Sequence, residues 1–526
     1  MRLVRRCCPV LLVLLFVSFL ASPGMAGPGS SGDAPAVETR VTVIKGATVM
    51  DGTGSRGRRA NVRIEGDRIV DVGKAAPPPG AIVVDGARLA LAPGFIDTHS
   101  HGDDQIFDHG DALAVTSQGI TTLVVGQDGG SYFPLARFFR RLERHPAAVN
   151  VASYAGHGTL RERVMGDDFR RHATDAEVGS MKRLLEKEMR AGAIGLSSGL
   201  EYDPGIYSAP EEVIELARVA AAHGGRYISH IRSEDRYFWK AIDEIIEIGR
   251  VARLPVQISH TKLAMLKWWG QADKLIARLE RARAQGVNIT GDMYPYLYWE
   301  STLTVLFPER DFEDRAAAAL VLKEISRPDG LLLTQFDPEP SYAGKTVAAI
   351  ARMRRSDPVT TLIDLIRMSE AMRKETGRGA ESVIGTSMQE PDVERLMAWR
   401  WMNFCTDGYL EGPHPRGFGS FPRILGRYAR GRKVMTIEEA VRKASALAAA
   451  NMGFTDRGLI KPGLRADLVL FDPKTVIDRA TPAEPHALSA GIDKVWVNGV
   501  LVFADGKATG ARPGRVLRRG GSQDGG

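Results

Sequence analysis

Cysteine is scarce in this sequence: the 526 residues contain three, and two of them, Cys7 and Cys8, lie close to the N-terminus. A framework of internal disulfides is therefore excluded as a source of stability. Long apolar runs are equally scarce, because residues 7–21 form the only one that stands out. Since each transmembrane helix needs roughly 20 apolar residues, a protein with several membrane spans is excluded as well.

A strong excess of one charge is also absent. The formal net charge is +7, and several of the arginines lie before residue 7 or after residue 511. A modest excess distributed in this way builds no basic face, so we do not expect nucleic acid to be a partner. With 44% hydrophobic and 25% charged residues, the composition is that of a globular protein that buries a sizeable core.

The N-terminus has the three parts of an export signal. Residues 1–6 are basic, residues 7–21 are apolar, and small residues precede a cleavage site after Ala26. We therefore expect export to the periplasm or the medium, with no attachment to the membrane once the signal is removed. An uncleaved anchor is the alternative, although the apolar run is shorter than the roughly 20 residues of a span. Cleavage would leave Cys405 as the remaining cysteine.

Short β-type runs lie at both ends of the rest of the chain, in residues 41–72 and 466–499. Between them, strand patterns such as Thr121–Val125 and Val256–His260 alternate with helical patterns such as Glu211–Ala222. This alternation predicts an α/β fold with a parallel barrel or a doubly wound sheet. The two β-rich flanks predict a second domain that is assembled from both chain ends.

These patterns divide the chain into consecutive segments. The alternation breaks between about residues 297 and 381, which we interpret as an insertion late in the barrel. The last residues are rich in glycine and arginine, which predicts a flexible basic tail. The expected segments are a signal peptide (1–26), a linker (27–40), the first part of the β domain (41–92), the barrel (93–455), the second part of the β domain (456–510) and the tail (511–526).

Histidines and a carboxylate collect where predicted strands end. His99 and His101 have the i, i+2 spacing that places both imidazoles on one face of a strand. His230 and His260 each end a further strand, and Asp407 follows a late one. In a (β/α)₈ barrel the C-terminal strand ends meet at one mouth. Each residue alone is more often structural, but four histidines and a carboxylate at such ends favour a zinc site with one open position.

The motifs around these residues resemble the amidohydrolase superfamily and, more narrowly, the N-acyl-D-amino-acid deacylases (D-aminoacylases). The opening motif is PGFIDTHSH at residues 93–101, and the closing strands contain RGLIKPG at residues 457–463. The resemblance covers roughly residues 41–508. The further matching motifs are GHGTLR (156–161), LEYDPG (200–205), SHIRSE (229–234), SHTK (259–262), DMYPY (292–296), HPR (414–416) and GSF (419–421).

The resemblance implies a (β/α)₈ barrel beside a small β-sandwich, with zinc as the cofactor. It implies that His230 and His260 bind one tightly held zinc, and that His99 and His101 form a second, weaker metal position. The third tight ligand of the family is a cysteine that follows an early strand, but this sequence has Asp128 there. A carboxylate binds or bridges zinc as a harder ligand than a thiolate. One metal or two therefore stay open as alternatives.

The resemblance also implies roles in catalysis and substrate binding. Asp407 matches the catalytic aspartate, which takes a proton from the metal-bound water and passes it to the leaving amine. Lys262, Tyr294 and Arg416 match positions that hold the α-carboxylate of the substrate, a task that suits a guanidinium, an ammonium and a phenol. Three residues of the matching motifs receive no role from the sequence: His157, Glu201 and His414.

The implied activity is zinc-dependent cleavage of the linear amide of an N-acyl-D-amino acid by metal-activated water. The products are a carboxylate and a free D-amino acid. A D-dipeptidase or a cyclic amidase on the same barrel is an alternative, although three carboxylate-binding residues count against cyclic amides. A decayed secreted binding protein is a further alternative, raised by the missing cysteine and opposed by the four histidines and Asp407. The acyl group, the side chain and the oligomeric state leave no signal in the sequence.

Overall fold

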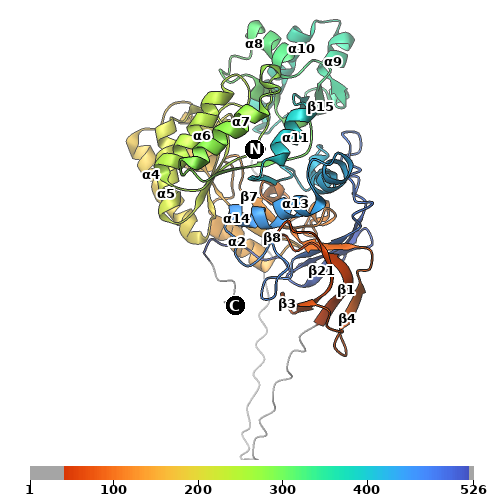
Figure 1. Ribbon diagram of the computed structural model, residues 1–526. Coiled ribbons are helices and arrows are strands. Elements are labelled where there is room, and N and C mark those ends of the chain that lie inside the picture. The colour runs from red at the N-terminus through yellow and green to blue at the C-terminus, as the bar shows by residue number, and fades with distance from the viewer. Residues whose placement is uncertain (1–40, 521–526) are drawn as a thin grey trace, which may run out of the picture. The chain divides into compact units, whose positions relative to one another are not determined.

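The computed structural model describes residues 41–520 (Figure 1). The expected signal peptide (1–26) and linker (27–40) lie outside the described residues. Within residues 41–520, every helix is too short or too polar to cross a membrane.

Parallel strands form the expected barrel, and each is buried because helices cover one face and the barrel interior the other. Hydrogen bonds join the strands into two arcs, β6-β7-β8 and β9-β10-β11-β12-β13-β18. The arcs meet where Asp407 N donates to His99 O at 2.8 Å. The strands are β6 (Phe95–Asp97), β7 (Ile120–Val125), β8 (Asn150–Ser153) with β9 (Ala155–Gly156), β10 (Gly195–Gly199), β11 (Arg226–His230), β12 (Val256–Ile258), β13 (Ile289–Met293) and β18 (Met402–Phe404).

Amphipathic helices surround these strands (Figure 1). Helix α4 begins with a capping box between Thr174 and Glu177 and ends at Gly192 with φ of 112°, a conformation that glycine adopts without strain. Helix α6 buries Ile242, Ile245 and other apolar residues of one face. The covering helices include α2 (Leu135–Arg144), α3 (His157–Met165), α4 (Asp175–Ala191), α5 (Pro210–Ala222), α6 (Phe238–Ala252), α7 (Ala272–Ala284), α11 (Glu390–Ala398), α12 (Arg416–Arg423), α13 (Ile437–Arg442) and α14 (Ala448–Met452).

The β domain is one nine-stranded sheet to which both chain ends contribute. The two ends meet where β19 pairs antiparallel with β5, with Leu470 opposite Leu91. Ile44, Val62 and Trp496 belong to its buried core. The strands are β1 (Val41–Val49), β2 (Arg58–Glu65), β3 (Arg68–Gly73), β4 (Ile82–Asp85), β5 (Ala90–Pro93), β19 (Leu468–Phe471), β20 (Ile492–Val497), β21 (Val500–Ala504) and β22 (Lys507–Ala508).

The late insertion forms a small sheet of its own with the order β14-β17-β15-β16. It extends past the expected end at residue 381, because its strand β17 runs to Thr386 and pairs Gly385 with Trp299 of β14. Its helices lie together in Figure 1. The elements are β14 (Tyr298–Ser301), α8 (Arg315–Leu320), β15 (Leu331–Phe336), β16 (Lys345–Thr346), α9 (Val347–Arg354), α10 (Pro358–Thr376) and β17 (Glu381–Thr386).

The tail expected to be flexible from residue 511 is instead packed on the barrel through residue 519. Val151 N donates to Arg515 O at 2.9 Å, and Leu517 N donates to Val151 O at 2.8 Å. Leu517 is buried. The expectation was wrong because it rested on the basic composition of this segment and overlooked two apolar residues, Val516 and Leu517. Their burial against β8 holds the backbone in place.

Candidate metal centre and substrate pocket

The loops that follow the barrel strands carry the predicted metal ligands. His99 and His101 come after β6, and Asp128 comes after β7. His230 is the last residue of β11, and His260 lies two residues beyond β12. The topology therefore brings these residues to one mouth, together with Asp407 from the loop after β18.

Three of these residues have a strained backbone. The φ angles of Asp128, His260 and Asp407 are 51°, 32° and 50°. A residue other than glycine in this region costs on the order of 1–3 kcal/mol and persists only where the surrounding structure enforces it. The left-handed region lies at φ of about 50–70°, so His260, at 32°, deviates from it the most of the three. Such strain is concentrated at functional sites.

One group of ligand atoms surrounds the carboxylate of Asp407. Its Oδ1 lies 3.3 Å from His99 Nε2 and 3.2 Å from His101 Nε2. Asp128 approaches the same two imidazoles, with Oδ1 at 3.4 Å from His99 Nε2 and Oδ2 at 3.4 Å from His101 Nε2. Two ligand atoms on one tetrahedral zinc, each about 2.0–2.2 Å from it, lie roughly 3.3–3.6 Å apart. The spacing of this group therefore fits a metal ion.

A second group adjoins the first. His230 Nδ1 lies 3.1 Å from His260 Nε2, and His260 Nε2 lies 3.6 Å from Asp128 Oδ1. These spacings also approximate the roughly 3.3–3.6 Å between ligands of one tetrahedral zinc. Asp128 thus takes part in both groups, at the place where the sequence departs from the cysteine of the family.

Buried polar atoms without hydrogen bonds support the fit of a metal ion to these ligand groups. His99 Nε2 and Asp128 Oδ1 are buried and have no hydrogen-bond partner among the described residues. A buried polar atom left unpaired costs about 1–3 kcal/mol, and a cation between these two atoms removes that cost. Imidazole nitrogen and carboxylate oxygen are ligands that zinc accepts. The donor set therefore fits the metal that the sequence predicts.

The electrostatics keep the carboxylates ionised. Burial acts to raise the pKa of Asp128, but His99, His101 and His260 outweigh it and hold that pKa well below its usual value. Burial has the same effect on Asp407, where Arg416 and then His260 lower the pKa. Both side chains are therefore negatively charged at neutral pH and suited to hold a cation.

The two histidines of the second group have opposite pKa shifts. Burial lowers the pKa of His230 to about 4, so its imidazole is neutral. Burial and Lys262 act to lower the pKa of His260 as well, but Glu234, Asp407 and Asp128 raise it to about 10. His260 therefore holds a proton where a metal would bind, and metal binding would release that proton.

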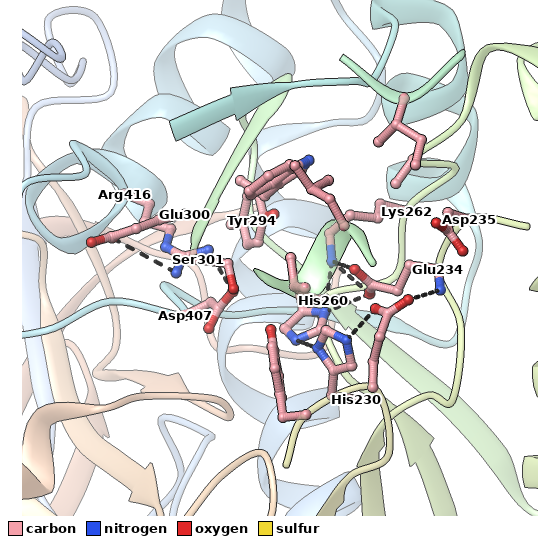
Figure 2. Close-up of a pocket in the computed structure, with 17 residues that line it drawn as sticks. His230, Glu234, Asp235, His260, Lys262, Tyr294, Glu300, Ser301, Asp407 and Arg416 are labelled. Atoms are coloured by element: carbon pink, nitrogen blue, oxygen red, sulfur yellow. Dashed lines mark hydrogen bonds and ion pairs between the residues drawn. The ribbon is translucent and has the colours of Figure 1, made fainter. Parts of the chain in front are cut away.

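Sequence reasoning missed two buried glutamates behind these histidines. Glu201 Oε2 lies 2.8 Å from His230 Nε2. Glu234 Oε1 lies 3.0 Å from His260 Nδ1, and Figure 2 labels both of these residues. Both glutamates belong to motifs that match the family, LEYDPG and SHIRSE, and this was the available signal. No residue spacing in the sequence indicates that either glutamate contacts a histidine of a neighbouring strand end.

The three predicted carboxylate-binding residues line one hollow of about 470 Å³ together with Asp407 (Figure 2). The Tyr294 hydroxyl and Arg416 Nε are buried without a partner among the described residues. Arg416 NH1 donates to Asp407 Oδ2 at 2.5 Å. Lys262 differs from the other two, because its Nζ already donates to both oxygens of Glu234 at 2.6 Å.

An apolar wall completes this hollow. It consists of Ala264 from the loop after β12 and of four residues supplied by the insertion: Trp299, Val305, Leu306 and Ile325. The indole N–H of Trp299 donates to Ser387 Oγ at 2.8 Å, so the ring offers only carbon to the hollow. A second hollow of about 1140 Å³ adjoins the first, and His101, Asp128 and Tyr409 are among the residues that line it.

Comparison with known proteins identifies the family of this chain. A family model described as the amidohydrolase family matches residues 83–326 and 336–503. An N-acyl-D-glutamate deacylase and a D-aminoacylase, both from Alcaligenes xylosoxydans xylosoxydans, are 37% and 36% identical to the chain over 91% of it and over 96% and 97% of their own lengths.

A solved structure is similar over the same extent. N-acyl-D-glutamate deacylase from Bordetella bronchiseptica, complexed with zinc and a phosphonate inhibitor that mimics the tetrahedral intermediate, matches with a TM-score of 0.81 and 35% identity. The match covers 92% of this chain and 100% of that one. The chain therefore belongs to the amidohydrolase family and, within it, to the N-acyl-D-amino-acid deacylases, which are hydrolases of linear amides.

Proposed function

We propose that this chain is an exported zinc hydrolase that converts N-acyl-D-amino acids with an apolar side chain into a carboxylate and the free D-amino acid. The observation that carries the proposal is the convergence of four histidines and two aspartates beside two buried donors without partners, Tyr294 OH and Arg416 Nε. Export rests on the basic and apolar segments of residues 1–26 alone.

Two metal positions that share Asp128 follow from the spacing of the ligand atoms. His230, His260 and Asp128 would hold one zinc, and His99, His101, Asp407 and Asp128 would hold the second. Bound zinc polarises a carbonyl and lowers the pKa of water to about 7. Asp128 would contribute to both positions, since its Oδ1 lies near His99 and His260 and its Oδ2 lies near His101.

Asp407 is the residue placed to move the proton. Its Oδ1 faces the histidines of the metal centre, and its Oδ2 accepts a hydrogen bond from Arg416. A carboxylate in this position accepts a proton from the attacking water and delivers it to the nitrogen of the leaving amino acid. Arg416 keeps the carboxylate oriented between the two steps.

The α-carboxylate of the substrate would accept hydrogen bonds from Arg416 Nε and Tyr294 OH, which satisfies both donors. Lys262 would support this subsite through its charge, since its hydrogen bonds go to Glu234 and His260. A cyclic amide has no free carboxylate and would leave the two donors unpaired, which opposes a cyclic amidase.

The side chain of the substrate amino acid would lie on the apolar wall. Sequence identity does not decide the side chain, because the D-glutamate-specific relative and the D-aminoacylase are almost equally similar to this chain. The charges of the hollow support an apolar side chain, because Lys262 and Arg416, the two basic residues that line it, are each paired with a carboxylate. Among the described residues no further lysine or arginine lines this hollow to bind a second substrate carboxylate, and Asp235 and Glu300 would repel one.

The test is a substrate panel with metal analysis on the same preparation of residues 27–526. We expect zinc in the purified protein and hydrolysis of N-acetyl-D-leucine that exceeds hydrolysis of N-acetyl-L-leucine, N-acetyl-D-glutamate and N-acetyl-D-leucinamide. Preference for D-leucyl dipeptides would favour a dipeptidase, and preference for 5-isobutylhydantoin would favour a cyclic amidase. Bound zinc without turnover of any substrate would favour a binding protein.

Substitutions at Asp128 test the shared ligand. Asp128→Ala should lower both the zinc content and the turnover, because it removes an oxygen from each metal position. Asp128→Cys should hold zinc at least as tightly as the parent, since thiolate is the softer ligand. Normal zinc content and normal turnover in Asp128→Ala would contradict the proposal, and Asp128 would then only cap a turn before Gly129.

A further inference from the structure

The two histidines of the second ligand group face each other through different ring nitrogens. His230 presents Nδ1 and His260 presents Nε2, at a separation of 3.1 Å. A neutral imidazole has one N–H and one nitrogen with a free lone pair, and a metal needs the lone pair. The proton must therefore lie on Nε2 of His230 and on Nδ1 of His260 when a metal binds between them.

Each nitrogen that must carry the proton contacts a buried carboxylate. His230 Nε2 lies 2.8 Å from Glu201 Oε2, and His260 Nδ1 lies 3.0 Å from Glu234 Oε1. Glu201 is 5% exposed, and the Glu234 side chain is 13% exposed. Because an ionised carboxylate only accepts hydrogen bonds, each glutamate in its ionised form stabilises the ring form that directs the lone pair towards the metal position.

Lys262 makes the role of Glu234 necessary. Its Nζ lies 2.8 Å from His260 Nδ1, where it can only donate a hydrogen bond to a lone pair. That contact favours the opposite ring form of His260, which places the proton on Nε2 and blocks the metal. Glu234 counteracts it by accepting from Lys262 through both oxygens at 2.6 Å.

Glu201 has a further contact, and this contact makes the Glu201→Gln substitution disruptive. Its Oε1 accepts from the backbone N of Glu234 at 3.2 Å, while its Oε2 faces His230. Both oxygens thus face N–H groups. The amide of a glutamine offers one acceptor and one donor group, so Glu201→Gln must place its donor against one of the two N–H groups.

We propose that Glu201 and Glu234 are positioning residues that set the ring forms of His230 and His260 and thereby raise the zinc affinity of this position. The inference rests on the proposed zinc-dependent function. Neither glutamate is required to contact the metal or the substrate. Loss of a hydrogen-bond partner behind a metal ligand typically costs about 10–100-fold in metal affinity.

The chain contains a matched control outside the metal centre. Glu212 Oε1 lies 2.7 Å from His157 Nε2, and Glu212 Oε2 accepts from Arg161 at 2.5 Å. This pair is buried like the first, but His157 belongs to neither ligand group. Glu212→Gln therefore disturbs a buried histidine–glutamate pair without changing a metal ligand.

The experiment measures zinc affinity by competition with a chelator on the metal-stripped full enzyme, together with the visible absorption spectrum of the cobalt-substituted enzyme. We expect Glu201→Gln and Glu234→Gln to weaken zinc binding about 10–100-fold and to alter the cobalt spectrum. Glu212→Gln should lower thermal stability while the affinity and the spectrum stay at parental values. If Glu201→Gln does not fold, Glu234→Gln decides, because it tests the same arrangement on the neighbouring histidine.

A double variant sharpens the test at His260. Lys262→Met removes the competing donor, so Glu234→Gln combined with Lys262→Met should recover part of the zinc affinity that Glu234→Gln loses. Parental affinity in both glutamine variants, or an equal loss in Glu212→Gln, would overturn the inference. Failure of the parent enzyme itself to bind zinc would instead contradict the proposed function, so the two failures are distinguishable.

Discussion

Two buried aspartates at opposite ends of the barrel strands differ in how their oxygens are satisfied. Asp467 lies at the junction with the β domain, where Oδ1 accepts from Asn498 N at 2.7 Å and Oδ2 accepts from Asn150 Nδ2 at 3.2 Å and from Arg457. Asp128 lies at the mouth, and its Oδ1 has no donor in the described part of the chain. The first carboxylate is complete within the protein, whereas we propose that a cation completes the second.

This difference distinguishes buried charges that stabilise the fold from buried charges that bind a ligand. A buried charge whose partners are all protein groups adds to folding only while those partners remain, and its loss is a loss of stability. A buried charge that keeps one oxygen without a hydrogen bond and has a strained backbone, as Asp128 does at φ of 51°, lowers stability until its ligand binds. Substitutions at the mouth should therefore change activity and metal content, whereas substitutions at the junction with the β domain should change the free energy of unfolding.

The largest effect is expected for Asp407→Asn at the mouth. Turnover should fall roughly 10²–10⁴-fold, the usual loss when a general acid–base is removed, while the zinc held by His230 and His260 remains. Steady-state kinetics and metal analysis of the variant beside the parent enzyme are the measurements. Activity within about threefold of the parent, far short of an acid–base loss, would show that the role assigned to Asp407 is wrong.

Asp467→Asn, at the junction with the β domain, should lower stability where Asp407→Asn lowers turnover. The free energy of unfolding should fall by about 1.5–3 kcal/mol, the value of one hydrogen bond to a charged group, because Arg457 loses Asp467 and keeps Asp456 as its partner. Urea denaturation measures the loss, and zinc content and KM of the folded enzyme should match those of the parent. A fall in zinc affinity without a fall in stability would remove the distinction between the two ends.

Arg416→Lys is expected to have a smaller effect that depends on the substrate. Lysine keeps the charge but loses the second prong of the guanidinium, so KM for N-acetyl-D-leucine should rise roughly 10- to 150-fold, the value of one charge-assisted hydrogen bond. KM for N-acetyl-D-leucinamide should change little. Because Arg416 also contacts Asp407, kcat should fall for both substrates; an equal rise of both KM values would indicate a purely structural role.

The smallest effect is expected for Ile325→Val on the apolar wall. One lost methylene is worth about 0.8 kcal/mol, so kcat/KM for N-acetyl-D-leucine should fall about fourfold. N-acetyl-D-alanine serves as the control, since its methyl group does not extend to Ile325. If both substrates lose activity in parallel, the side chain of the substrate does not lie on this wall.

Much of the fold and part of the site followed from local patterns. The alternation of strands and helices predicted a parallel barrel or a doubly wound sheet, and the family motifs implied the barrel. In a barrel, the strand-end positions predicted that His99, His101, His230 and His260 would meet. The insertion ends at Thr386 and not at residue 381, because the pairing of β17 with β14 leaves no mark in the sequence. The basic composition of residues 511–519 likewise concealed the burial of Leu517.

The sequence by itself determined which residue types stand at the strand ends, because strand periodicity is local and the barrel topology directs all those ends to one mouth. Only the tertiary structure decided that Asp128 faces both ligand groups, that Glu234 holds Lys262, and that Glu201 contacts His230. Those contacts join residues from separate loops at hydrogen-bond distance. Their existence depends on packing to within fractions of an ångström, which no sequence spacing encodes.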